Sequence, residues 1–150
     1  PPDARMERRR ILPRVLLAAI LSLTSLGLLA YAFWPKPSPP CSVLAGFGSH
    51  EAGGRCEVDR GLNLAGFDGP LLPDNLTIHG GLDIYGQRLD RLPRGLVVEG
   101  DLFFYKATYD LPADVVVGGG IGAQLGFGDR LLRCADIPKT ARIAGAVRCE

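Results

Sequence analysis

Hydrophobic and polar residues alternate along four stretches of this 150-residue chain, each of which follows a proline. Counted from that proline, apolar residues occupy offsets 3, 5, 9 and 11, and glycine occupies offset 7. Alternation with a period of two predicts short β-strands that bury one face. The anchoring residues of the copies are Pro73, Pro93, Pro112 and Pro138, with a weaker first copy anchored at Gly53.

The copies start 20, 20, 19 and 26 residues apart, a spacing typical of solenoid proteins. One copy is too small to bury its apolar face alone, so the copies must stack and turn their apolar positions into continuous ladders. We interpret the offset-7 glycine as a corner between two strands, where a Cβ would crowd the coil or forbid a positive φ. The pattern predicts an all-β repeat domain of about five coils.

The segment from Leu72 to Pro93 reads L-P-D-N-L-T-I-H-G-G-L-D-I-Y-G-Q-R-L-D-R-L-P. It resembles the bacterial leucine-rich-repeat-like pattern L-P-x-x-L-x-V-x-G-x-L-x-L-x-G-x-x-L-x-x-L-P, and the resemblance covers roughly residues 53–149. It implies a scaffold that binds a partner. The usual leucine-rich repeat has a short strand and a ladder of asparagines. Here an amide fills the asparagine position only once, at Gln87, and the alternation runs longer than usual. Both departures favour a short parallel β-solenoid over a horseshoe.

An uncharged run, residues 15–34, precedes the repeats and is long enough to cross a bilayer of roughly 30 Å as a helix. Five arginines precede this run, so the positive-inside rule places the N-terminus in the cytoplasm. Ala30-Tyr31-Ala32 leaves a cleaved signal peptide as the alternative. The expected parts are a basic cytoplasmic N-terminus (1–14), a transmembrane helix in contact with lipid (15–34), a proline-rich linker (35–40) and the repeat domain (41–150).

This topology predicts a bacterial inner-membrane protein whose repeat domain lies in the periplasm, an oxidising compartment. The four cysteines suit that location, and the economical pairing is Cys41 with Cys56 and Cys134 with Cys149, although the other connectivities remain open. Such bonds would close both ends of the solenoid. His50 and His79 show no metal-ligand spacing with the cysteines, so neither a metal nor a cofactor is expected.

Residues 41–150 carry eleven Lys or Arg and fourteen Asp or Glu, a net charge of −3. This mildly acidic balance argues against a nucleic-acid partner. Outward positions of neighbouring coils should stack, placing His79 beside Glu99 and Tyr85 beside Tyr105. The resulting candidate binding surface contains two tyrosines, a phenylalanine, a histidine and three carboxylates, namely Tyr85, Phe103, Tyr105, His79, Glu99, Asp83 and Asp101.

Such a surface is typical of protein or glycan binding, whereas an aromatic ladder can also serve only to stabilise a sheet. A glycosidase pair among Asp83, Glu99 and Asp101 would lack the desolvation that separates two carboxyl pKa values, so we expect no catalytic residues and no enzyme. The glycines of V-V-V-G-G-G-I-G-A-Q-L-G (115–126) resemble a dinucleotide turn, but the repeat register accounts for them and no helical pattern comes after them.

Together these features predict a membrane-anchored structural or interaction module, an accessory subunit or scaffold that binds a protein of the envelope. The alternative is a secreted carbohydrate- or surface-binding protein released after Ala32. A polysaccharide-active enzyme is the less favoured third interpretation.

Overall fold

Short parallel strands, repeated about every twenty residues, build the part of the chain that the structure describes. The computed structural model describes residues 36–86, 89–106, 108–124, 126, 130 and 132–150. Within it, residues 38–150 form one compact unit. None of the described helices is long and apolar enough to span a bilayer, and the predicted membrane segment 15–34 lies outside the described residues.

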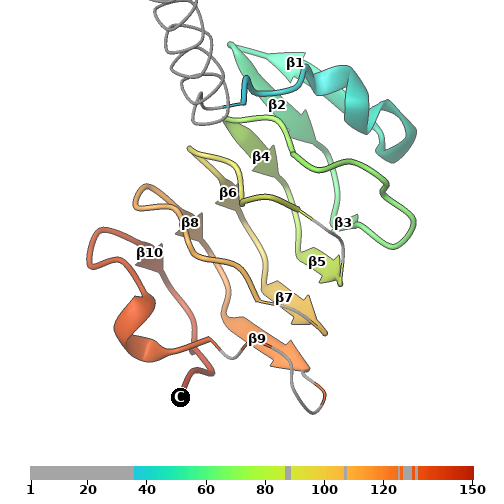
Figure 1. Cartoon of the computed structure of the whole chain (residues 1–150). Coiled ribbons are helices and arrows are strands. Elements are labelled where there is room, and N and C mark those ends of the chain that lie inside the picture. Colours follow the sequence, from blue (N-terminus) through green and yellow to red (C-terminus); the bar gives the residue numbers. More distant parts are fainter. Residues whose placement is uncertain (1–35, 87–88, 107, 125, 127–129, 131) are drawn as a thin grey trace, which may run out of the picture. The chain divides into compact units, whose positions relative to one another are not determined.

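Two sheets run along the repeat axis, and each coil except the last adds one parallel strand to both sheets (Figure 1). The first sheet contains β1 (Ser49–Ala52), β2 (Arg55–Val58), β4 (Leu76–Ile78), β6 (Val97–Val98), β8 (Val116–Val117) and β10 (Arg142–Ile143). The second contains β3 (Leu62–Asn63), β5 (Leu82–Tyr85), β7 (Leu102–Tyr105) and β9 (Ile121–Gln124). Every pairing is parallel except that of β1 with β2. The fold is therefore a parallel β-solenoid, as the alternation predicted.

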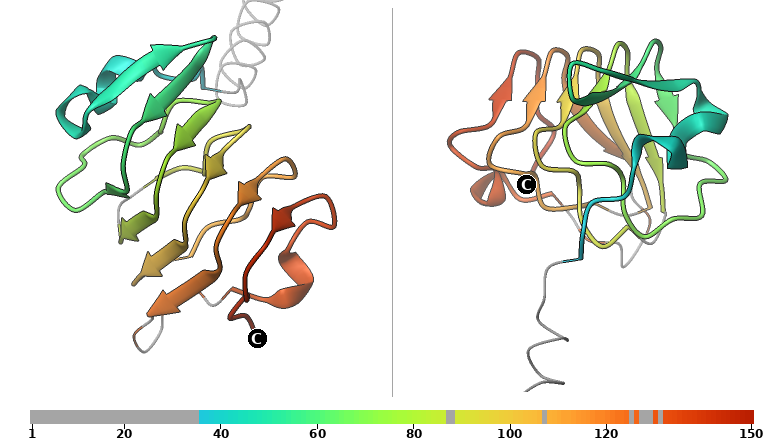
Figure 2. Two further views of the ribbon diagram at one scale, coloured as in Figure 1. Left: turned by 180° about the vertical axis from the view of Figure 1, so that it is seen from behind. Right: turned by 90° about the horizontal axis from the view of Figure 1, so that it is seen from above.

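The strand register reproduces the proline-based alignment. Leu82 pairs with Leu102 and Leu102 with Ile121, all at offset 9. In the first copy, Leu62 pairs with Leu82, so the weak repeat anchored at Gly53 is in register as well. Figure 2 shows the coils stacked in sequence order.

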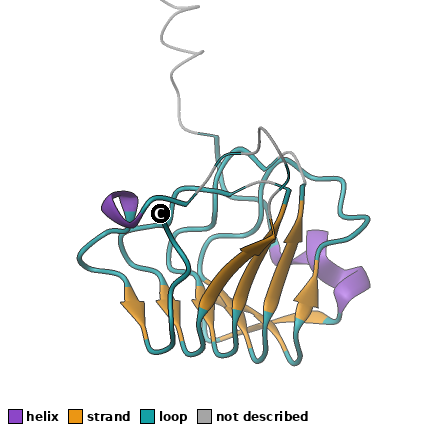
Figure 3. Cartoon of the chain, turned by 90° about the horizontal axis from the view of Figure 1, so that it is seen from below, coloured by secondary structure: helices purple, strands orange, loops and turns teal. Residues whose placement is uncertain are grey.

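Apolar ladders fill the interior of the solenoid. The residues with no more than 1% exposure include those at the inward offsets of the central coils, namely Leu76, Ile78, Leu82, Ile84, Leu96, Val98, Leu102, Phe104, Val115, Val117 and Ile121. Loops close the third side of each coil (Figure 3), and from it Leu89, Leu92 and Leu111 point into the same core. Burial of each such side chain contributes roughly 1.5–3 kcal/mol, so in-register stacking is the main source of stability.

The offset-7 glycines are required by the close approach of successive coils. A Cβ at Gly100 would lie 2.7 Å from the Gly81 nitrogen and 2.8 Å from the Gly80 carbonyl carbon. Gly80, Gly119 and Gly145 would clash with the preceding coil in the same way. None of these four glycines has a positive φ. Of the two explanations that the sequence offered, crowding is therefore the one that applies.

Disulfides close both ends of the solenoid with the predicted pairing, Cys41 to Cys56 and Cys134 to Cys149. The first ties the 3₁₀ helix η1 (Cys41–Phe47) to β2, and Leu44 of η1 is fully buried over the first coil. The second ties the 3₁₀ helix η2 (Cys134–Asp136) to the C-terminal segment. The sequence pattern predicted neither 3₁₀ helix, nor the hairpin that β1 forms with β2.

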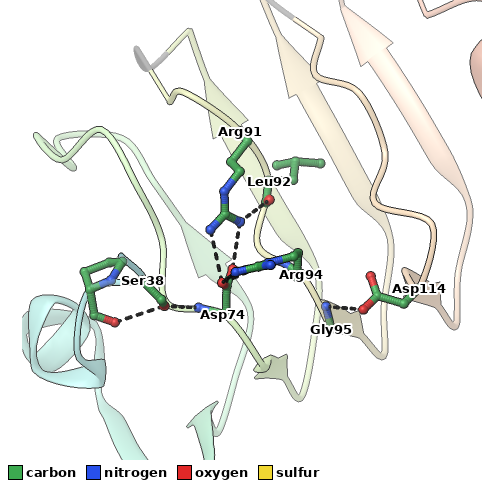
Figure 4. Close-up of polar contacts among 8 residues, drawn as sticks. Ser38, Asp74, Arg91, Leu92, Arg94, Gly95 and Asp114 are labelled. Carbon is green, nitrogen blue, oxygen red and sulfur yellow. Dashed lines mark hydrogen bonds and ion pairs between the residues drawn. The ribbon is translucent and has the colours of Figure 1, made fainter. Parts of the chain in front are cut away.

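Arginine–carboxylate contacts hold the proline turns of successive coils together (Figure 4). Asp74 accepts hydrogen bonds from Arg91 Nη1 at 2.7 Å and from the Arg94 main-chain nitrogen at 2.9 Å. The Asp74 nitrogen in turn donates to Ser38 Oγ at 2.7 Å, so a residue of the expected linker contacts the repeat domain. In the next turn, the Gly95 nitrogen donates to the Asp114 carboxylate at 2.8 Å.

Candidate functional site

Tyr85, Phe103 and Tyr105 form a continuous cluster on the outer face of the second sheet, and we call these three residues the aromatic surface. They project from β5 and β7 at alternate positions, opposite to the buried ladder that contains Ile84 and Phe104. The parallel register places Tyr85 directly beside Tyr105. Tyr85 is 37% exposed, and only one other large apolar side chain of the described residues is exposed to this degree.

The two tyrosine rings stack nearly face to face, with centroids 4.1 Å apart and planes 5° from parallel. Phe103 is tilted against Tyr105, with centroids 4.6 Å apart. The hydrogen bond between the tyrosine hydroxyls raises the pKa of Tyr105, and burial and the Tyr85 and Asp83 charges add to the effect. The rings therefore form one ordered platform at the surface.

Polar residues flank this platform along the same rows of the sheet. Asp83 pairs with Phe103 on one side and with Asn63 on the other, and Gln124 pairs with Tyr105. An apolar centre with a carboxylate and amides at its edge is the composition of many binding surfaces.

Gly122 lies beneath the ring of Phe103. A Cβ at this position would come within 2.7 Å of Phe103 Cε2. The phenylalanine ring therefore covers the space that the missing side chain of Gly122 leaves. The glycine-rich segment itself forms β8 and β9, as the repeat register predicted.

A second polar cluster lies on the first sheet, where His79 joins two carboxylates. His79 Nε2 is 3.2 Å from Glu57 Oε2, and His79 Nδ1 is 3.0 Å from Glu99 Oε1. His50 continues the row, with Nε2 3.9 Å from Glu57 Oε2 and Nδ1 3.8 Å from Asp59 Oδ2. We call these five residues the histidine–carboxylate ladder.

Hydrogen bonds to Glu57 and then Glu99 raise the pKa of His79, while partial desolvation opposes the shift. The five side chains follow one another in a row. In the described ranges, no three His, Cys, Asp or Glu side chains are placed to hold a metal ion together.

The structure thus separates the seven predicted surface residues into groups. Tyr85, Phe103, Tyr105 and Asp83 lie on the second sheet, whereas His79 and Glu99 belong to the ladder at the end of the first. Asp101 lies at the corner between the sheets, where its Oδ1 accepts a hydrogen bond from the Gly120 nitrogen at 2.6 Å. The predicted adjacency of His79 with Glu99 and of Tyr85 with Tyr105 is confirmed.

Sequence reasoning missed the contributions of His50 and Glu57. Both belong to the β1–β2 hairpin, in which they are paired in register. The signal that could have revealed it is Gly53-Gly54, since both glycines have positive φ and such a pair is a common hairpin turn.

In comparisons with known proteins, no family model, no curated protein and no solved structure matches this chain. The leucine-rich-repeat resemblance therefore gains no support from a family match, and a functional proposal for this chain depends on the geometry of the site.

Proposed function

We propose that the repeat domain is an extracytoplasmic interaction module that binds a protein of the cell envelope through the aromatic surface. The observation that carries the proposal is the ordered, partly exposed stack of Tyr85 on Tyr105 with Phe103 against it. Tyrosine and phenylalanine supply large contact areas at small cost in side-chain entropy, and such residues are enriched at the centres of protein interfaces.

The disulfides support the extracytoplasmic part of the proposal. Two bonds close loops at opposite ends of the domain, and no free cysteine occurs in the described residues. Structural disulfides of this kind persist in oxidising compartments and are rare in the cytosol. The apolar run at 15–34 supplies the proposed anchor in the inner membrane, with the N-terminus in the cytoplasm.

The experiment is co-purification from detergent-solubilised membranes with the full chain as bait. The triple variant Tyr85→Ala, Phe103→Ala, Tyr105→Ala should lose the partners that the wild type retains. The matched control is Val97→Ala with Val116→Ala, because these half-buried residues lie on the outer face of the other sheet. Unchanged partners in the aromatic variant would refute the assignment of the surface. A separate measurement, the intact mass of the exported protein, tests the membrane anchor. A mature N-terminus at Phe33 would exclude that anchor.

A glycan is the second candidate ligand, and the position of Asp83 favours it. Asp83 lies beside Phe103 in the sheet, and a carboxylate next to stacked rings can bind sugar hydroxyls while the rings contact C–H faces. Binding of envelope polysaccharide that is abolished by Asp83→Asn would support this candidate. Measurable turnover of the polysaccharide by the wild type would instead indicate an enzyme.

A further inference from the structure

The histidine–carboxylate ladder contains both histidines of the chain, and the aromatic surface does not use it. Its members come from successive elements of the solenoid. His50 belongs to β1, Glu57 to β2, Asp59 follows β2, His79 follows β4 and Glu99 follows β6. The ladder therefore connects the N-terminal hairpin with the next two coils.

His79 occupies the central place because both of its ring nitrogens face a carboxylate oxygen at hydrogen-bonding distance, 3.2 Å to Glu57 and 3.0 Å to Glu99. A neutral imidazole carries one N–H and can donate only one of these bonds, whereas the imidazolium ion donates both. An ionised carboxylate accepts hydrogen bonds and cannot donate one. The observed bridge is thus fully satisfied only when His79 is protonated.

The loss of that proton leaves one ring nitrogen as a lone-pair acceptor opposite a carboxylate oxygen. One of the two contacts must then open, either toward β2 or toward the turn after β6. The main chain is joined at the same place, because the His79 nitrogen donates to the Val58 carbonyl at 2.9 Å and the Glu99 nitrogen donates to the Ile78 carbonyl at 3.0 Å. A change in the side-chain bridge therefore acts on the bonds that hold three consecutive coils together.

We propose that His79, bridging Glu57 and Glu99, is a pH-dependent contact. Below neutral pH it stabilises the packing of the N-terminal hairpin and the following two coils, and this stabilisation is lost as the pH rises. The charged and titratable groups that face it are Glu57 from β2 and Glu99 from the turn after β6. Asp59 and His50 complete the row on the hairpin side.

The direction of the effect follows from linkage. The contacts with Glu57 and Glu99 raise the pKa of His79 above its ordinary value of 6.5 in the folded protein. A group with a raised pKa stabilises the fold fully below its unfolded pKa, and this stabilisation is lost as the pH rises through the folded value. Histidine is the side chain whose ordinary titration lies nearest to physiological pH, so the His79 contact changes over a pH range that a cell surface can encounter.

The test is an NMR titration of the two imidazole rings in the full chain, together with hydrogen-exchange protection of the His79 and Glu99 amides. His79 should titrate above 6.5, and protection of both amides should fall as the pH passes that midpoint. His79→Gln places a neutral amide in the row. Amide protection in this variant, compared with the wild type at each pH, should not show this fall. His50→Gln is the matched control, because its ring nitrogens lie 3.8 and 3.9 Å from the carboxylates, beyond hydrogen-bonding distance.

Glu99→Gln provides a second route if His79→Gln does not fold, because it removes one charge and keeps the ring. In that variant the His79 midpoint should fall, and high salt should also lower the midpoint in the wild type because the ladder is exposed to solvent. A His79 midpoint at or below 6.5 would overturn the proposal. The same pH profile of amide protection in the wild type and in His79→Gln would also overturn it.

Discussion

Tyr85 and Tyr105 stack with parallel rings 4.1 Å apart, although a complete coil of the solenoid separates them in sequence. The contact follows from the register of β5 with β7, which places equivalent positions of consecutive repeats side by side. A repeat that conserves its length can therefore build an ordered surface from residues that are distant along the chain, and any change in register would dismantle that surface.

Replacement of Tyr85 by alanine should lower the free energy of unfolding by about 0.5–1.5 kcal/mol beyond the loss of buried area, the usual contribution of an aromatic pair. Tyr85→Phe keeps the ring and should retain most of this contribution. Chemical denaturation of the two variants checks the prediction. Equal destabilisation by both substitutions would mean that the hydroxyl, rather than the stack, supplies the energy.

The phenol of Tyr105 should titrate above its ordinary pKa of 10.0 because Tyr85 hydrogen-bonds to it. Tyr85→Phe removes that bond and should lower the Tyr105 pKa. Ultraviolet difference titration of the variant against the wild type measures the change, and Tyr109→Phe is the control because Tyr109 lies outside the stack and packs against Phe104. Superimposable curves for the wild type and Tyr85→Phe would contradict the contact.

Gly100→Ala should destabilise the solenoid by about 1–3 kcal/mol, because its Cβ would meet the main chain of the preceding coil. Gly46→Ala is the matched control, since a Cβ there meets nothing within 4 Å and the φ of Gly46 is not positive. Because alanine has less conformational freedom than glycine in the unfolded chain, Gly46→Ala should leave the stability unchanged or raise it by up to about 1 kcal/mol. A tolerated Gly100→Ala would show that the coils can separate to accept a methyl group.

Asp74 should make stability fall at acid pH. Burial of its carboxyl acts to raise the pKa, but hydrogen bonds from Arg91 and Arg94 and the charge of Arg91 outweigh it and lower the pKa from 3.8 to about 2. A group with a lowered pKa stabilises the fold above its unfolded value, and this contribution of about 2 kcal/mol is lost as the pH falls from 3.8 through 2.

Asp74→Asn should accordingly cost most near neutral pH and least near pH 2, and Asp68→Asn, at an exposed position, is the matched control. Denaturation curves across this range separate the two. A constant penalty for Asp74→Asn at all pH values would mean that its hydrogen bonds matter and its charge does not.

The two disulfides should differ in how readily they are reduced. Cys41 and Cys56 are 6% and 4% exposed, whereas Cys134 is exposed to solvent. Increasing reductant, followed by alkylation and mass spectrometry, should therefore label Cys134 and Cys149 first. Each bond closes a loop of fifteen residues, and its removal should cost about 3 kcal/mol. Labelling of Cys56 before Cys134 would contradict the burial of the N-terminal bond.

The solenoid and its neighbour relationships were predictable because stacking imposes one physical rule on every coil. An inward position must be apolar in each repeat, so the alternation around Leu82, Leu102 and Ile121 fixed the register, and the register fixed the adjacency of His79 with Glu99. The cysteine spacing then placed the disulfides at the two ends.

The features that the sequence did not reveal lie where this rule does not apply. The β1 strand reads Ser-His-Glu-Ala, which carries no apolar alternation, and its pairing depends on a local glycine turn. Asp74 and Arg91 meet in the loops, where no repeat position constrains them. The position of Phe103 over Gly122 depends on the choice of a rotamer, which a pattern of polarity cannot specify.

Site-specific photo-crosslinking from the aromatic surface tests the central claim most directly. A benzophenone amino acid at position 85 or 103 of the full chain, activated in intact cells, should form a defined adduct with one envelope protein, and the same probe at position 97 or 116 of the other sheet should not. Equal adducts from both sheets, or none from positions 85 and 103 in a correctly folded protein, would contradict the proposal that the aromatic surface contacts the partner.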